Sequence, residues 1–427
     1  MKISVIVPAY NSEAFLRETL DCLINQTLKD IQIIVVNDGS TDSTADIIEE
    51  YAAKHPNILP VYQENAGVSA ARNNGIARSE GKYTMFLDSD DLITEDTLEN
   101  VFAALEEANA DMAVFRVMRF GFGGEEYNPI VEALAKESEI NCFDKRLLWN
   151  FLVANKCYRT DMLKNSGVLF PALKYSEDGA FLMQFIYKAR PKITGVYSAV
   201  LKYRRHTPSE GLSVSQRVNL SLAEDFTQAH AIVYRAAQEA LGSSKPDYLQ
   251  EIIYKNYFAL ITEFYRLLWN GDDETLAFIG KQSDELKAKM TPETLKKCQN
   301  AVRDIGKPLF SKAEIAENPI VSVIVKNCSE EFLSALYSQS MPVFELIVPQ
   351  SANAPERENV TVLPDKGFSK EAKKRAKGAV KIFLSGKKAL DLRFLKIVSM
   401  LKKSHKFGAF PDFMIKLGAL LFLKIKR

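Results

Sequence analysis

The chain has 427 residues, of which 47% are hydrophobic and 26% are charged, and its formal net charge is +1. This length predicts two or three globular domains rather than one. The apolar N-terminus has no basic segment or cleavage site of a secretory signal, and no run of about 18 apolar residues predicts a transmembrane helix. Five scattered cysteines without a Cys-x-x-Cys pair exclude a disulfide framework and a zinc knuckle, and they favour the reducing cytoplasm.

Strand and helix patterns alternate along the first 120 residues. Short apolar runs typical of strands are separated by segments whose apolar residues have helical spacing. The predicted strands are 3–7, 31–36, 83–87 and 112–117, and the predicted helices are 13–27 and 95–108. This alternation predicts an α/β fold with a mostly parallel, Rossmann-like sheet.

Three of these strands are followed by polar, turn-forming residues. Residues 8–11 follow the first strand, residues 37–40 follow the second, and residues 88–91 follow the third. Ligands of parallel α/β sheets bind beyond the carboxyl ends of the strands. The three clusters therefore predict a single ligand site at this edge of the sheet.

The Asp88-Ser89-Asp90 cluster has the composition of a site for a divalent cation. One or two carboxylates, together with substrate phosphates, bind such a cation, which neutralises a leaving diphosphate. The alternative interpretation is a cap for helix 95–108, because Asp and Ser are preferred at helix N-termini. A cap does not need three acids in four residues, so we favour the cation site.

Four motifs in the first half of the chain together resemble one enzyme family. They span residues 5–11, 36–42, 65–73 and 86–91. In order and spacing they resemble the family 2 inverting glycosyltransferases of GT-A fold, and the resemblance covers residues 1–215. It implies a Rossmann-like GT-A domain that binds a nucleoside diphosphate sugar, UDP-linked by preference, together with Mg²⁺ or Mn²⁺.

The resemblance also implies roles for individual residues. Asp38 is expected to accept a hydrogen bond from a uracil-type base, and Asp90 to bind the metal directly. The implied set comprises Pro8, Tyr10 and Asp38 for the base, Asn65, Gly67 and Arg72 for the diphosphate sugar, Asp88 for ribose and metal, and Asp90 for the metal.

Residues further along the chain correspond to the family's catalytic and closing segments. Asp178 is implied as the general base that deprotonates the acceptor hydroxyl, with Glu177 positioning Asp178 or the acceptor. The alternative is a solvated acid pair before a helix. Arg205 and Ser213 are implied to contact the diphosphate, and arginine suits phosphate geometry. We rank the neighbouring His206 below Arg205.

The second half of the chain begins with helical patterns and ends with a partial repetition of the first half. An aromatic stripe over residues 254–268 is interpreted as helix packing. From residue 321 three segments echo the strands of the first half in the same order, which suggests an internal copy. In this alignment Ser351 replaces Asp38, Ser385 replaces Asp88 and Lys387 replaces Asp90, so the copy cannot hold a cation. The alternative is an unrelated α/β module.

These patterns predict four parts: a GT-A domain over 1–217, a helical region over 218–316, a degenerate lobe over 317–410, and a basic amphipathic tail over 411–427. Residues 366–427 carry 18 Lys and Arg against three acids, a balance of +15 that leaves −14 on the preceding residues. Such a segment is typical of peripheral binding to an anionic membrane, here the inner face of the plasma membrane. A solvated surface or a tail packed on the acidic body are the alternatives, and no motif indicates nucleic-acid binding.

The sequence thus predicts a metal-dependent inverting glycosyltransferase with one active site. Its expected substrates are a nucleotide-sugar donor and a glycan acceptor of the cell envelope, such as a lipid-linked oligosaccharide, lipopolysaccharide or capsule repeat. A nucleotidyltransferase acting on sugar phosphates is one alternative, although residues 8–11 do not form the expected glycine-rich basic loop. A non-catalytic glycan-binding scaffold is the other, although the first half retains the acids that the chemistry needs.

Overall fold

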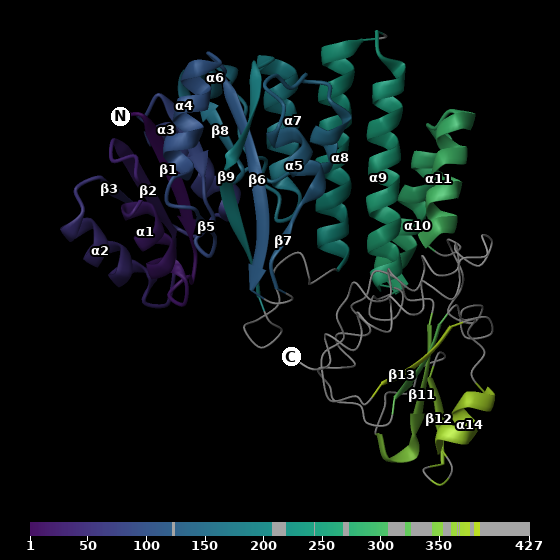
Figure 1. Ribbon diagram of the computed structural model, residues 1–427. Helices are drawn as coiled ribbons and strands as arrows, with labels where there is room; N and C mark the ends of the chain where they lie inside the picture. Colours follow the sequence, from purple (N-terminus) through teal and green to yellow (C-terminus); the bar gives the residue numbers. More distant parts are fainter. Residues whose placement is uncertain are drawn as a thin grey trace. The chain divides into compact units, whose positions relative to one another are not determined.

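The computed structural model describes residues 1–121, 124–206, 219–242, 244–267, 273–305, 321–325, 344–352, 360–364, 366, 368–375 and 380–384. The chain divides into two compact units, Met1–Lys255 and Asn256–Arg427. Each unit is described by itself below, with its elements labelled in Figure 1.

The first unit is built on a nine-stranded sheet whose N-terminal half is parallel. Strand β1 lies between β2 and β4, and β3 pairs with the far side of β2, giving the order β3-β2-β1-β4. The bounds are β1 Ile3–Ala9, β2 Ile31–Asp38, β3 Ile58–Gln63 and β4 Tyr83–Phe86. The strand order reverses at β1, and ligands of such sheets bind where the order reverses, so a ligand site is expected at the carboxyl ends of β1 and β4.

Helices connect these parallel strands because each crossover must bury an apolar face on the sheet. In α1, Leu16, Leu20 and Leu23 recur at helical spacing and are fully buried. The helices of this half are α1 Leu16–Ile24, α2 Thr44–Lys54, α3 Val68–Arg78 and α4 Thr97–Glu107. The predicted helices 13–27 and 95–108 are confirmed as α1 and α4.

The other half of the sheet mixes strand directions. Strand β8 runs antiparallel between β4 and β6, whereas β6 and β9 are parallel. The strands are β5 Leu92–Ile93, β6 Met112–Gly121, β7 Glu126–Tyr127, β8 Lys156–Arg159 and β9 Ile193–Arg205. The helices are α5 Pro129–Ala135, a 3-10 turn at Lys145–Trp149, α6 Thr160–Ser166 and α7 Glu177–Ala189.

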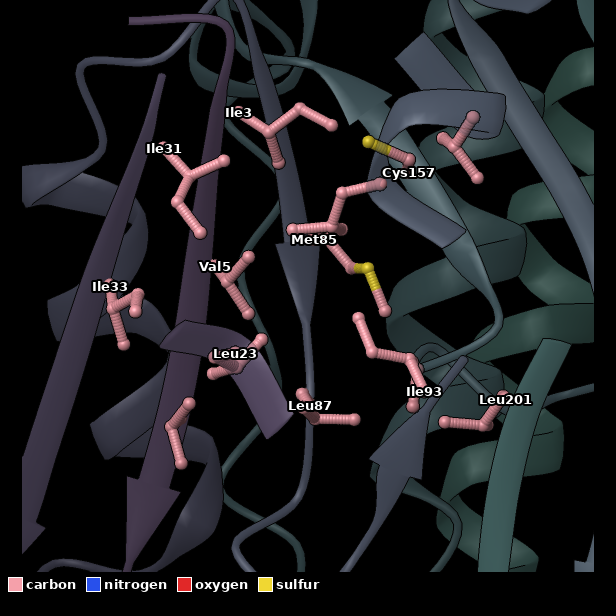
Figure 2. Close-up of a cluster of buried hydrophobic side chains, with 14 of the residues drawn as sticks. Ile3, Val5, Leu23, Ile31, Ile33, Met85, Leu87, Ile93, Cys157 and Leu201 are labelled. Carbon is pink, nitrogen blue, oxygen red and sulfur yellow. The ribbon is translucent and has the colours of Figure 1, made fainter. Parts of the chain in front are cut away.

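Two apolar layers cover the two faces of this sheet. Ile3, Val5 and Val7 belong to one core cluster, and Ile6, between them in the sequence, belongs to the other. Figure 2 shows the first cluster, with labelled side chains from β1, β2, β4, α1 and the strands beyond. Helix α7 is apolar on most sides, with eight buried residues, and belongs to the second cluster. The predicted α/β fold is confirmed.

Long helices follow the sheet along the chain, as the helical pattern predicted. They are α8 Leu220–Leu241, α9 Pro246–Leu267, α10 Asp273–Ala288 and α11 Pro292–Ile305. Helix α8 packs on α7. Within the aromatic stripe Tyr257, Leu260 and Ile261 are buried, as the packing interpretation requires. No helix in the described part of the chain is long and apolar enough to cross a membrane.

The second unit contains a four-stranded parallel sheet with the order β12-β11-β10-β13. The strands are β10 Val321–Val325, β11 Phe344–Pro349, β12 Val360–Leu363 and β13 Val380–Leu384, and helix α14 spans Phe368–Arg375. This order repeats that of β3-β2-β1-β4. Ile33 pairs with Ile58, and Leu346 pairs with Val360, so the pairing register repeats as well.

The shared order and register support the proposal that the second unit is a reduced copy of the first. The segment before α14 repeats the sequence pattern Gly67-Val68-Ser69 as Gly367-Phe368-Ser369. In this alignment Ala372, which is fully buried, takes the position of Arg72. Ser385, Lys387 and the tail 411–427 lie outside the described residues, so the boundaries at 217, 316 and 410 stay predictions.

Helix α3 approaches β1 closely at Gly75, where a Cβ would lie 2.4 Å from Ile6 Cγ2. We expect Gly75→Ala to destabilise the first unit by roughly 1–3 kcal/mol through overpacking, measured as a lower urea midpoint. Gly280→Ala in α10 is the control: nothing lies within 4 Å of its Cβ position, so the helix should gain about 0.5–1 kcal/mol. Equal midpoints for the two variants would contradict this packing.

Candidate active site

The candidate site lies at the carboxyl ends of β1, β2 and β4. Tyr10, directly after β1, is 51% exposed and offers an open aromatic face, whereas Pro8 is buried within the strand. Asn65 and Gly67 lie in an exposed loop ahead of α3. These predicted residues therefore surround the edge that the topology selects.

Asp38 holds the loop before α3 in place. Its Oδ1 accepts hydrogen bonds from Gln63 Nε2 at 2.8 Å and from the Ala66 amide at 2.9 Å, and its Oδ2 accepts one from the Gly67 amide at 2.8 Å. Gly67 has a φ of +88°, which favours glycine at this position. Asp38 is thus an organiser of the loop, and its contact with a base stays a prediction.

The buried Arg72 guanidinium contacts carboxylates from both predicted substrate sites, the one for the sugar donor and the one for the acceptor. Arg72 Nη2 donates to Asp88 Oδ1 at 2.8 Å. Its Nη1 donates to Glu177 Oε1 at 2.9 Å and to Asp178 Oδ1 at 2.7 Å. The guanidinium also lies over the Phe170 ring, 5.2 Å from its centre. Residues more than 100 positions apart are thereby held within the reach of one side chain.

The carboxylates around Arg72 keep its guanidinium protonated. Burial alone would lower the pKa of Arg72, but attraction to Asp178, Asp88 and Glu177 outweighs burial and raises that pKa. An arginine with three carboxylate partners stays charged. It is therefore a permanent positive centre between Asp88 and Asp178.

Asp178 has the environment of a general base. Burial raises the pKa of Asp178 to about 7, although Arg72 opposes this shift and Glu177 adds to it. Its Oδ2 also faces the Val153 amide at 3.4 Å. At Gly179, a Cβ would lie 2.3 Å from the Phe151 ring, so the start of α7 is packed tightly against the loop 150–155. The carboxylate is held by fixed neighbours on both sides.

Lys156 stabilises the loop 150–155 through hydrogen bonds. The Lys156 side chain is fully buried, and its ammonium donates to the Asn150 carbonyl at 3.1 Å, to the Leu152 carbonyl and to Asn155 Oδ1 at 2.8 Å. Burial lowers the pKa of Lys156 to about 7, and the nearby Asp178 carboxylate limits this shift. The sequence patterns assign Lys156 no role.

The end of β9 closes the other side of the acidic cluster. His206 Nε2 lies 2.6 Å from Asp90 Oδ2. Arg204 donates through Nε to the Asp90 carbonyl at 2.7 Å, and its amide donates to Asp91 Oδ1 at 2.8 Å. The structure therefore brings Arg204 and His206 onto the cluster. The Arg205 side chain makes no hydrogen bond or ion pair within the described part of the chain, although its backbone pairs with β6, and Ser213 lies outside that part.

Asp88 and Asp90 carry the side chains of this cluster that suit a hard divalent cation. Carboxylates are typical ligands of Mg²⁺ and Mn²⁺, and Asp88 and Asp90 are each 33% exposed, so phosphate oxygens can reach them. In the described residues no group of three His, Cys, Asp or Glu side chains is arranged to hold a metal ion.

Comparison with known proteins identifies the domain that carries this site. Residues 4–167 match the family model described as Glycosyl transferase family 2. The N-terminal domain is a family 2 glycosyltransferase domain. The predicted resemblance is confirmed, and Arg72, Asp88 and Asp90 lie inside the matched segment.

Bacterial glycosyltransferases are similar over the same half of the chain. Glycosyltransferase GlyA of Streptococcus pneumoniae is 36% identical over 219 residues, which are 48% of this chain and 30% of GlyA. The Staphylococcus aureus enzyme named poly(ribitol-phosphate) beta-N-acetylglucosaminyltransferase TarS is 33% identical over 190 residues, covering 43% of this chain and 32% of TarS. The chain thus spans about a third of the length of these relatives.

A solved structure confirms the GT-A fold. The crystal structure of S. aureus TarS superposes with a TM-score of 0.55 at 23% identity, over 71% of this chain and 53% of TarS. This level of identity establishes the fold alone.

The raised pKa of Asp178 predicts the pH dependence of activity. A general base must be ionised, and the carboxylate fraction of Asp178 grows as the pH rises through about 7. We expect kcat/KM for sugar transfer to rise about tenfold per pH unit below pH 7 and to level above it. Asp178→Asn should lose this limb. A flat wild-type profile between pH 5.5 and 8.5 would contradict the assignment.

The buried contacts of Lys156 predict a positioning role. Lys156→Met leaves the Asn150 and Leu152 carbonyls without their donor, at roughly 1–3 kcal/mol each, and loosens the loop against Asp178. We expect kcat to fall more than tenfold while the dissociation constant of the nucleotide sugar stays within about threefold. Lys82→Met is the matched control, because Lys82 pairs with Glu106 at the surface. Equal effects of the two variants on kcat would exclude the role.

Proposed function

We propose that this chain is an inverting, metal-dependent glycosyltransferase that moves a sugar from a nucleoside diphosphate sugar to a hydroxyl of a cell-envelope glycan. The observation that carries the proposal is the bridge from Arg72 to Asp88, Glu177 and Asp178. It brings an acid of the sugar-donor side and the acids of the acceptor side to one guanidinium. A UDP-linked sugar is the first donor to test.

Asp178 acts as the general base of the proposed reaction. The acceptor hydroxyl donates its proton to the Asp178 carboxylate as its oxygen attacks the anomeric carbon. The bond from that carbon to the diphosphate oxygen breaks, and the diphosphate leaves from the opposite face. Inversion converts an α-linked donor sugar into a β-glycoside. The pKa of about 7 places Asp178 where it is both ionised and basic near neutral pH.

Arg72 orients the base and supplies positive charge next to the leaving group. Its two contacts on Nη1 fix the Glu177 and Asp178 carboxylates at the start of α7. Because Arg72 is only 3% exposed, its positive charge acts in a low-dielectric setting, where fixed charges stabilise a developing anion most strongly. Glu177 is left to position Asp178 or the acceptor.

Asp90 and Asp88 are the proposed holders of Mg²⁺ or Mn²⁺. When bound, the cation neutralises the charge that develops on the diphosphate. Asp88 and Asp90 would hold the cation at the carboxyl end of β4, beside His206, whose Nε2 lies 2.6 Å from Asp90 Oδ2. Tyr10 and the loop shaped by Asp38 are the proposed contacts of the base and the diphosphate sugar.

The acceptor class rests on the relatives. GlyA is named a glycosyltransferase, and TarS is named for transfer to poly(ribitol-phosphate). We therefore propose a glycan or glycan-like polymer of the cell envelope as acceptor, and action on the cytoplasmic side of the membrane. Association of the basic segment 366–427 with an anionic membrane belongs to the same proposal, and most of that segment lies outside the described residues.

Two substitutions separate the proposed roles. Asp90→Asn removes a metal ligand and should weaken Mn²⁺-dependent binding of a UDP-sugar at least tenfold. Asp178→Asn should leave that binding within about twofold and lower transfer at least 1,000-fold. Binding is measured by calorimetry across a panel of UDP-, GDP- and dTDP-sugars, and transfer by release of the nucleoside diphosphate.

Asp161→Asn is the matched control for these variants, because Asp161 is an exposed residue at the start of α6. It should change neither quantity. Equal loss of donor binding in Asp90→Asn and Asp178→Asn would contradict the separate roles. A wild-type protein that binds none of the nucleotide sugars would contradict the proposed function itself.

A further inference from the structure

An exposed aromatic and cationic surface lies on β6, β7, α5 and β9, whose places are shown in Figure 1. We call it the Tyr197 platform, made of Arg116, Tyr127, Lys136 and Tyr197. Tyr197 is 44% exposed and Tyr127 is 39% exposed, so both rings can contact an external molecule. The Arg116 guanidinium lies 4.3 Å from the centre of the Tyr197 ring and 5.2 Å from that of Tyr127. Lys136 Nζ lies 5.0 Å from the Tyr197 ring centre.

A β-bulge produces the platform. Phe115 pairs with Val196 and Arg116 pairs with Val200, so residues 197–199 of β9 have no partner on β6. Bulges redirect side chains and are frequent beside active sites. Here the bulge presents Tyr197 outward, between the arginine of β6 and the lysine that follows α5.

Neither cation of the platform has an anionic partner within the described part of the chain. Arg116 and Lys136 make no ion pair there, and Arg116 Nε is buried without a hydrogen-bond acceptor. The nearest acid in sequence, Glu137, is paired with Arg146 at 3.0 Å. Arg116 and Lys136 both contact the exposed Tyr197 ring and have no carboxylate partner there. They can therefore bind an anion from outside the protein.

The platform lies on the same face of the sheet as the proposed base. Met112 and Val114, on the face of β6 that also carries Arg116, belong to the core cluster that contains α7. The residue before Arg116, Phe115, exchanges hydrogen bonds with Asn155 at 2.8 and 3.1 Å. Asn155 belongs to the loop that faces Asp178 through Val153. The two sites are therefore joined by one short segment.

We infer that the Tyr197 platform is an acceptor subsite that binds a phosphate-bearing unit of the glycan. This inference rests on the proposed function and adds the acceptor's charge to it. A sugar or polyol packs its C–H groups against the exposed part of the Tyr197 ring, and the adjacent phosphate oxygens accept hydrogen bonds from Arg116 and Lys136. A segment of the acceptor held there presents its next hydroxyl toward the loop beside Asp178.

The test uses the full chain and a fluorescent ribitol-phosphate hexamer as probe, with maltohexaose as the neutral comparison. Wild type should bind the phosphate hexamer at least tenfold more tightly than maltohexaose, and salt should weaken this binding. Tyr197→Ala, Arg116→Gln and Lys136→Met should each lower hexamer affinity at least fivefold. Lys136→Met should also reduce the salt dependence. Titration of a UDP-sugar into each variant measures the donor site separately.

Two variants serve as matched controls. Tyr62→Ala removes a similarly exposed tyrosine from β3 at the opposite edge of the sheet, and Lys188→Met removes an exposed lysine near the end of α7. Both should bind the hexamer like wild type. The inference is overturned if wild type binds the two oligomers equally, or if the platform variants match the controls. Loss of UDP-sugar binding in wild type would instead overturn the proposed function while leaving hexamer binding interpretable.

Discussion

The buried Arg72 guanidinium is the interaction on which the rest of the candidate site depends. Arg72 comes from α3, Asp88 from the end of β4, and Glu177 and Asp178 from the start of α7. A buried charge is tolerated only when it is paired, and here three carboxylates supply the pairing. The same contacts fix the acids against electrostatic repulsion. The fold, the charge balance and the proposed chemistry are thus linked through one side chain.

The shared edge of the sheet explains why the remaining groups converge. The reversal of strand order at β1 collects the loops after β1, β2 and β4, and the long β9 brings its last residues to the same place. Asp38 accepts a hydrogen bond from the Ala66 amide in the loop before α3. In the loop after β4, Asp91 accepts a hydrogen bond from the Arg204 amide. Burial raises the pKa of Asp91 well above its usual range, and repulsion from the nearby Asp90 and Asp88 carboxylates adds to this rise. Three carboxyl groups thus lie close together at this edge of the sheet, and each disfavours the ionised form of the others.

The sequence predicted the strands and acids that have strong local signals, and it missed those that depend on packing. Strand β8 contains Lys156 and Arg159, which hide it from any apolar pattern, although the fold buries the lysine completely. Two of the three partners of Arg72, Glu177 and Asp178, lie 105 and 106 residues away along the chain, beyond any spacing rule. Along β9 neighbouring side chains point to opposite faces. The sequence does not show which of Arg204, Arg205 and His206 point toward the acidic cluster. From the sequence alone, Arg205 therefore ranks above His206, the residue that contacts Asp90.

If the second unit is a reduced copy of the first, as we propose, the replacement of Arg72 by Ala372 has an evolutionary consequence. Loss of one member of a buried ion cluster leaves the others uncompensated, at about 3–5 kcal/mol. An ancestor that lost only its acids would have retained an unpaired guanidinium beneath its sheet, and one that lost only the arginine would have retained repelling carboxylates. Decay of a duplicated catalytic unit must then pass through a narrow set of intermediates in which charges of both signs disappear together. A small, neutral, buried residue such as Ala372 is what such a concerted decay would leave behind.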